Sequence, residues 1–187
     1  MPNPIELYET AAAGFRKAMS GVKAEQLSLA TPCTEWSVQR LMNHNIKVTG
    51  FAHGVLTGSI QVDPFSVDEP LPSEGALTAF DRGVAQVLEE AQKPGVLEKT
   101  HETPFGPMLG AHFMMAPVGD LLIHRWDLSK GTSQDTALDQ GLVEVCHAAY
   151  AEQWEGMREM GFFQAAVAVP ENASLQDRLL GASGRQP

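Results

Sequence analysis

The sequence has few cysteines and no long apolar run, and each shortage excludes a class of protein. Its two cysteines, Cys33 and Cys146, lie far apart and outside any C-x-x-C motif. A disulfide framework is therefore not expected, and a reducing compartment is. No apolar run reaches the ~20 residues that cross a bilayer, and the start, MPNPIELYET, lacks the basic and apolar regions of a secretion signal. We therefore expect a cytoplasmic protein with no membrane partner.

Basic side chains are also scarce relative to acidic ones. The chain has 13 Lys and Arg against 23 Asp and Glu, a formal net charge of -10. This charge repels a phosphate backbone, so nucleic acid is not expected as a partner. With 187 residues, of which 43% are hydrophobic and 19% charged, the chain predicts one folded domain, residues 1–187. The composition leaves a monomer and a homodimer open.

Apolar residues recur every three or four positions through most of the chain, which is typical of amphipathic helices. The proline-rich stretch 59–73 is longer than a helical hairpin needs and predicts a crossover connection. We expect helices at about 4–22, 37–58, 74–92, 117–130 and 138–160, a short strand or hairpin within 96–110, an extended stretch at 162–170 and a short helix within 174–184. The predicted fold class is all-α: a four-helix bundle with a long crossover connection and short appended helix or strand pieces.

The segment DLLIHRWDLSKGT, residues 120–132, concentrates candidate ligands on one helical face. Asp120, His124 and Asp127 are spaced at i, i+4 and i+7, so the first two side chains can converge on one point. A tight site for zinc or a similar ion needs at least a third protein ligand, which another helix must supply. His44 is the best candidate, because it interrupts the apolar stripe of the second helix and should point into the bundle.

Spacing alone leaves a metal-free interpretation open. His44 and Asp120 are equally suited to hydrogen bonds in the core, and an acid beside Lys130 suits a solvated helix face or an ion pair. If an ion is bound, Asp127 is expected to orient a ligand or to cap a helix. His53 lies about half a turn from His44 and should face elsewhere.

Other reactive side chains lie near helix ends and in loops. Cys33 precedes the second helix, where the helix dipole favours a thiolate, although a small buried apolar role is the commoner fate of a free cysteine. Trp36 is expected to anchor the start of that helix in the core. His101 and His112 lie in a region rich in proline and glycine, where surface placement is expected.

Three segments resemble a known group of proteins: TPCTEWSVQRLMNH, DLLIHRWDLSKGTSQD and the tail PENASLQDRLLGASGR. The chain resembles the DinB-like superfamily, and within it proteins related to the metal-binding domain of mycothiol-dependent maleylpyruvate isomerase. The specific parts are T-P-C-x-x-W leading to Asn-His, and acid-x-x-x-His-x-x-Asp-Leu. The resemblance implies a four-helix bundle with a long crossover and a divalent ion bound by His44, Asp120 and His124. Zinc is expected, with nickel or another first-row ion as alternatives.

Two departures from the isomerase affect the expected function. The isomerase-like relatives have Glu where Asp120 stands, which shortens the reach to an ion by one methylene. The isomerase also has a further C-terminal domain that we expect this chain to be too short to contain. The resemblance implies a metal-dependent transferase or isomerase that uses a low-molecular-weight thiol of the mycothiol type and a small-molecule substrate. The alternative is a non-catalytic, metal-stabilised binding or stress-associated module.

Overall fold

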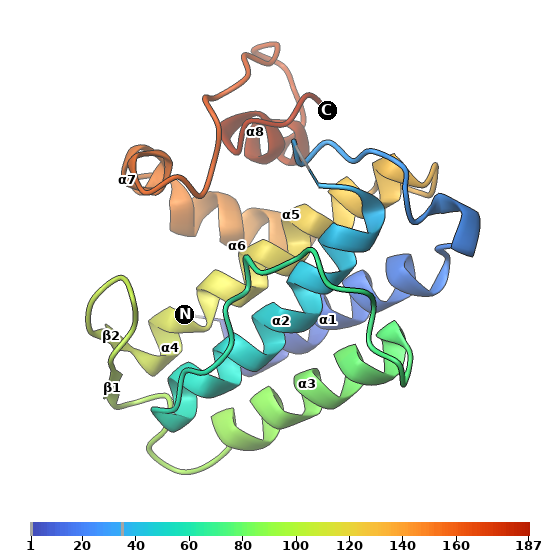
Figure 1. Cartoon of the computed structure of the whole chain (residues 1–187). Helices are drawn as coiled ribbons and strands as arrows, with labels where there is room; N and C mark the ends of the chain where they lie inside the picture. The colour runs from blue at the N-terminus through green and yellow to red at the C-terminus, as the bar shows by residue number, and fades with distance from the viewer. Residues whose placement is uncertain (1, 35) are drawn as a thin grey trace.

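The computed structural model describes residues 2–34 and 36–187. Within these residues, four long helices form a bundle: α1 (Pro4–Ser20), α2 (Val38–Thr57), α3 (Ala76–Ala91) and α5 (Met115–Gly131). Both α1 and α2 pack against α3 and α5, so each helix has two neighbours (Figure 1). Tyr8, Phe15, Leu41, Phe80 and Leu121 are fully buried between them. The predicted all-α bundle is confirmed.

Shorter elements are appended to the bundle. They are η1 (Ala24–Gln26), β1 (Thr100–His101), β2 (Met108–Leu109), α4 (Gly110–Phe113), α6 (Gln140–Tyr150), α7 (Trp154–Glu159) and α8 (Leu175–Ala182). Strands β1 and β2 pair antiparallel as the predicted short hairpin, and α6 packs against both α5 and α8. Among the described residues, no helix is both long enough and apolar enough to span a membrane.

The crossover connection between α2 and α3 is fixed to the bundle by side chains of α2. It runs back along α2, so α2 and α3 point in the same direction (Figure 1). The buried Asn43 side chain donates hydrogen bonds to the carbonyl oxygens of Val67 and Glu69. His44 contacts the carbonyl oxygen of Pro64. These bonds place residues of the crossover directly beside the inner face of α2.

Capping residues set the ends of the helices that carry the candidate ligands. Ser37 Oγ accepts a hydrogen bond from the Arg40 amide, 3.4 Å away, and α2 ends at Gly58 with a φ of +74°. A left-handed backbone conformation commonly ends a helix, and glycine adopts this conformation without strain. Pro117 lies in the first turn of α5, where an amide has no acceptor within the helix. Pro117 is therefore tolerated in the first turn of α5.

The helix predicted at 138–160 is wrong in one respect, because α6 ends at Tyr150 and α7 begins at Trp154. Tyr150 Oη donates to the carbonyl oxygen of Met115, 2.8 Å away, which ties the end of α6 to α5. The Trp154 ring packs edge-on against Tyr150 and Phe163, each with ring centroids 5.3 Å apart. These tertiary contacts favour a turn at 151–153, a stretch that contains neither proline nor glycine.

The surface expectation for His101 is also wrong. The side chain is buried, with 5% of the residue exposed. Its Nδ1 lies 3.1 Å from the carbonyl oxygen of Val55 and its Nε2 lies 2.7 Å from that of Val96. Val55 is in the last turn of α2, and its carbonyl oxygen also accepts from the amide of Gly58, 3.1 Å away. His101 is therefore a buried residue that contacts the C-terminal end of α2.

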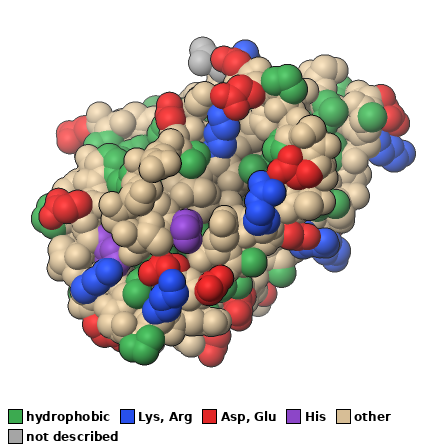
Figure 2. Space-filling view, turned by 60° about the horizontal axis from the view of Figure 1, so that its bottom comes forward, with side chains coloured by type: hydrophobic (Ala, Val, Ile, Leu, Met, Phe, Trp, Pro, Cys, Tyr) green, Lys and Arg blue, Asp and Glu red, His purple; other side chains and the backbone are tan. Residues whose placement is uncertain are grey.

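Charged side chains of both signs are interspersed on the face that includes α3 (Figure 2). Two ion pairs each include one residue of α3: Asp81 with Arg16 of α1 at 2.7 Å, and Arg82 with Glu74, which precedes α3, at 2.8 Å. All four side chains are partly exposed, so each pair contributes little to stability. The mixture leaves no basic patch on the face shown.

Candidate metal centre

The packing of α2 against α5 brings His44, Asp120 and His124 together. Asp120 Oδ1 lies 3.2 Å from His44 Nε2 and 3.6 Å from His124 Nε2. The three potential ligand atoms all lie within 4.8 Å of one another. The two imidazole rings are almost perpendicular, with centroids 5.0 Å apart. The structure therefore places the three candidate residues in one cluster.

Each imidazole is oriented by a hydrogen bond at its other nitrogen. His44 Nδ1 lies 2.8 Å from the carbonyl oxygen of Pro64, and His124 Nδ1 lies 2.9 Å from Asp127 Oδ2. Both of these partners can only accept, so in the neutral ring the proton is on Nδ1 and the Nε2 lone pair is free. Asp127 therefore orients the ring of His124. This is one of the two roles that the sequence predicted for Asp127.

The cluster has the donor set and the unmet charge that a cation would satisfy. With both rings neutral, two Nε2 lone pairs and the Asp120 carboxylate face one another. Asp120 Oδ2 is enclosed and has no hydrogen-bond partner among the described residues, and such a buried polar atom is costly unless it is satisfied. Two imidazoles and one carboxylate are a typical set for zinc and related first-row ions. The residues therefore fit a divalent ion.

Charge couples the histidines of the cluster to Asp120 in the metal-free protein. Burial would lower the pKa of His44, but the charge of Asp120 and the hydrogen bond to it outweigh burial and raise that pKa. Burial would raise the pKa of Asp120, but the neighbouring His44 and His124 hold it below its usual range. Asp120 is therefore ionised at neutral pH and supplies the negative charge at the centre.

Aromatic rings cover the histidines, while Asp120 leaves one side open. His44 is 2% exposed and His124 8%. The half-buried Trp36 ring lies 4.5 Å from the His44 ring and 5.7 Å from the His124 ring. Phe65, from the crossover, covers His44 at 5.7 Å. The Asp120 side chain remains 27% exposed, although its Oδ2 atom is enclosed.

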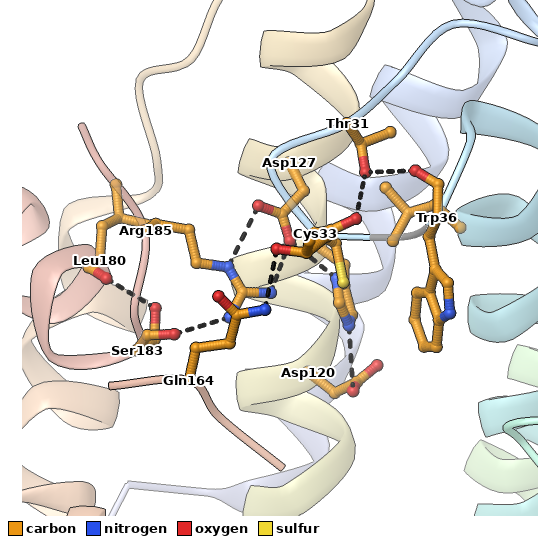
Figure 3. Close-up of polar contacts among 12 residues, drawn as sticks. Thr31, Cys33, Trp36, Asp120, Asp127, Gln164, Leu180, Ser183 and Arg185 are labelled. Atoms are coloured by element: carbon orange, nitrogen blue, oxygen red, sulfur yellow. Dashed lines mark hydrogen bonds and ion pairs between the residues drawn. The ribbon is translucent and has the colours of Figure 1, made fainter. Parts of the chain in front are cut away.

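Arg185 is the residue at this site that sequence reasoning missed. Its Nη2 and Nε lie 2.8 and 3.2 Å from the two carboxylate oxygens of Asp127 (Figure 3). Burial would raise the pKa of Asp127, but the charge of Arg185 and the hydrogen bond with His124 hold it below its usual range. The only sequence signal was its place in the tail segment PENASLQDRLLGASGR.

Cys33 lies beside the cluster as a partly buried thiol with a raised pKa. Its Sγ and potential ligand atoms of His124 and Asp127 lie within 4.8 Å of one another. Burial, with a smaller contribution from Asp127, raises the pKa of the Cys33 thiol to about 12. Of the two alternatives for Cys33, the structure therefore favours the buried, neutral cysteine over a thiolate stabilised by the helix dipole. Among the described residues, neither His53 nor His112 joins such a group.

The family of the chain follows from a match that includes the whole cluster. The model of the mycothiol maleylpyruvate isomerase N-terminal domain matches residues 8–129, more than half of the chain. The chain belongs to this family. Two similar proteins, described as uncharacterised and from two strains of Mycobacterium tuberculosis, are 31% identical to this chain over 153 residues. The alignment covers 80% of this chain and 79% of each relative.

Solved structures show the same fold at low sequence identity. The crystal structure of the mycothiol-dependent maleylpyruvate isomerase is similar with a TM-score of 0.62 and 13% identity, covering 82% of this chain and 70% of that one. A point mutant of that isomerase gives a TM-score of 0.59 at 12% identity with the same coverage. At such identities, the likeness to these two structures establishes the fold.

Proposed function

We propose that His44, Asp120 and His124 bind a divalent first-row metal ion, with zinc as the leading candidate. The observation that carries this proposal is the convergence of two imidazole Nε2 atoms on Asp120, while each Nδ1 is engaged elsewhere. A core hydrogen-bond network needs donors between these acceptors. Only a protonated His44 would donate to Asp120 Oδ1, 3.2 Å away, and Asp120 Oδ2 would still have no partner among the described residues.

We further propose that the loaded protein uses a low-molecular-weight thiol of the mycothiol type in a transfer or isomerisation of a small molecule. Membership of the isomerase N-terminal domain family supports this reaction class. An ion bound here would supply a Lewis acid that deprotonates a thiol or water at neutral pH. Asp120 and the two histidines would fix its position, and the exposed side of Asp120 provides the approach for both reactants.

Within this proposal the surrounding residues have separate tasks. Trp36 and Phe65 shield the histidines from water on one side, which strengthens electrostatic interactions in the centre. The Pro64 carbonyl and Asp127 keep protons on the Nδ1 atoms. The neutral thiol of Cys33, with its raised pKa, is not expected to act as the nucleophile.

A second candidate function is a metal-stabilised binding module without turnover. The observation that favours it is the near-complete burial of both histidines, since a structural ion joining α2 to α5 needs no access. Such sites are usually closed by four protein ligands, and the cluster provides three. The open side at Asp120 therefore favours the proposal that substrates bind.

Metal content after His44→Ala substitution tests the proposed site. The purified parent should retain close to one equivalent of metal after dialysis, measured by elemental mass spectrometry, whereas His44→Ala should lose most of it. His53→Ala is the matched control, because His53 lies on the same helix outside the cluster and should retain the metal. A His44→Ala protein with full metal content would refute the site.

Thiol binding tests the reaction class separately. Zinc-loaded protein should bind mycothiol in a calorimetric titration, and an S-methylated mycothiol, which cannot present a thiolate, should bind much more weakly. Equal binding of the two compounds, or of neither, would contradict a thiol-dependent role while leaving the metal site intact.

A further inference from the structure

Arg185 and Asp127 form a buried ion pair, and Asp127 also contacts His124 of the candidate centre. The two carboxylate oxygens of Asp127 accept from Nε and Nη2 of Arg185, a two-pronged geometry that fixes the carboxylate plane. One of the same oxygens lies 2.9 Å from His124 Nδ1. The Asp127 side chain is 0% exposed and that of Arg185 is 8% exposed. Water therefore does not compete for these bonds.

The backbone beyond α8 fixes the position of this arginine. Its Nη1 donates to the carbonyl oxygen of Ser183, 2.8 Å away, and its amide donates to that of Leu180 at 2.9 Å. Gly184, with a φ of +84°, makes the turn that returns the chain toward α5. Figure 3 shows the guanidinium pointing from the tail to Asp127. The chain after α8 therefore places the guanidinium of Arg185 beside Asp127 of α5.

From this arrangement we infer that Arg185 is a positioning residue for the metal centre, acting through Asp127 to hold His124 with its Nε2 directed at Asp120. The inference rests on the proposed metal site. Arg185 lies outside residues 8–129 that the family model matches, and 58 positions separate it from Asp127.

The physical reason is that Asp127 needs a fixed partner to orient His124. Without Arg185, the buried carboxylate would lose both guanidinium bonds and would be free to rotate. A rotated carboxylate no longer holds the proton on His124 Nδ1. The ring could then carry its proton on Nε2, the atom that faces Asp120, and this tautomer cannot ligate an ion there. Partners of this kind typically change metal affinity by about 10–100-fold.

The tautomer of His124 in the metal-free protein is the first test. A correlation spectrum of isotope-labelled histidine nitrogens distinguishes protonated from bare ring nitrogens. The parent should show His124 protonated at Nδ1, and Arg185→Met should show a mixture or the Nε2 tautomer. His44 should be unchanged in both proteins, because the Pro64 carbonyl holds it independently. Global unfolding would alter both histidines, so the contrast identifies a positioning role.

Zinc affinity, measured by competition with a chromogenic chelator, is the second test. Arg185→Met should weaken binding by about 10–100-fold, and Arg185→Lys should restore part of the loss because it keeps the charge without the two-pronged geometry. Arg178→Met is the matched control: Arg178 is an exposed arginine of α8 whose side chain, among the described residues, donates to the carbonyl oxygens of Glu171 and Ala173. It should bind zinc like the parent.

The outcomes separate this inference from the proposed function. If the parent binds no zinc, the proposed function fails, and the tautomer of His124 still tests the role of Arg185. If Arg185→Met does not fold, the Arg185→Lys protein tests the inference instead. It should show a mixture of His124 tautomers and a zinc affinity below that of the parent. A folded Arg185 variant with the parental His124 tautomer and parental zinc affinity would overturn the inference.

Discussion

At the residue scale, the two histidines of the cluster are oriented by unrelated parts of the chain. His44 depends on a backbone carbonyl of the crossover, at Pro64. His124 depends on a side chain of its own helix, Asp127, three positions away. A backbone carbonyl cannot be removed by mutation and cannot ionise, whereas the carboxylate needs Arg185. The orientation of His124, unlike that of His44, can therefore be changed by substituting a second residue's side chain.

Cys33 should be slow to react although it lies beside this centre. Burial raises its pKa to about 12, against about 8.5 for a free cysteine, so at neutral pH very little of the thiol is ionised. In metal-free Cys146→Ser protein, in which Cys33 is the remaining cysteine, alkylation by iodoacetamide should be roughly a hundredfold slower than that of free cysteine, or slower still. Mass spectrometry follows the reaction, and a rate close to that of free cysteine would contradict the buried neutral thiol.

At the element scale, local periodicity predicted half of the site and tertiary contacts decided the rest. The face shared by Asp120, His124 and Asp127 follows from helical spacing within one segment. His44 was predicted from its place in an apolar stripe. The guanidinium that pairs with Asp127 comes from 58 positions away, and no spacing rule connects the two. The turn at 151–153 and the burial of His101 likewise depend on packing partners that sequence patterns do not reveal.

The α2–α3 contact depends on a glycine. A Cβ at Gly83 would collide with the Thr49 side chain of α2, so Gly83→Ala must push the two helices apart or displace Thr49. Overpacking of this kind costs about 1–3 kcal/mol, and chemical denaturation should show a loss of that size.

Gly14 provides the matched control for this substitution. It also lies inside a long helix, α1, but a Cβ there has nothing within 4 Å. Gly14→Ala should therefore stabilise the protein by about 0.5–1 kcal/mol through helix propensity. Equal effects of the two substitutions would show that the close approach of α2 and α3 is not maintained in solution.

At the scale of the whole molecule, the apolar core and the candidate centre are largely separate sources of stability. Large buried side chains such as Tyr8, Phe15 and Phe80 fill the bundle between α1 and α3, which supply none of the three clustered residues. The centre joins only α2 and α5. Burial of the core alone is the dominant favourable term in folding, so the bundle should not require an ion in order to fold.

Thermal unfolding with and without zinc distinguishes an accessible centre from a structural one. Chelator-treated protein should remain folded and unfold cooperatively, because the core is intact. Added zinc should raise the free energy of unfolding as RT ln(1 + [L]/Kd), about 4 kcal/mol at a thousandfold excess over Kd, which for a chain of this size raises Tm by roughly 10 °C. His44→Ala should unfold near the metal-free parent and lose this dependence, while His53→Ala should keep it. A chelated parent that unfolds completely would favour the structural module, and a His44→Ala protein with the parental zinc dependence would contradict the site, since the ion would then be held elsewhere.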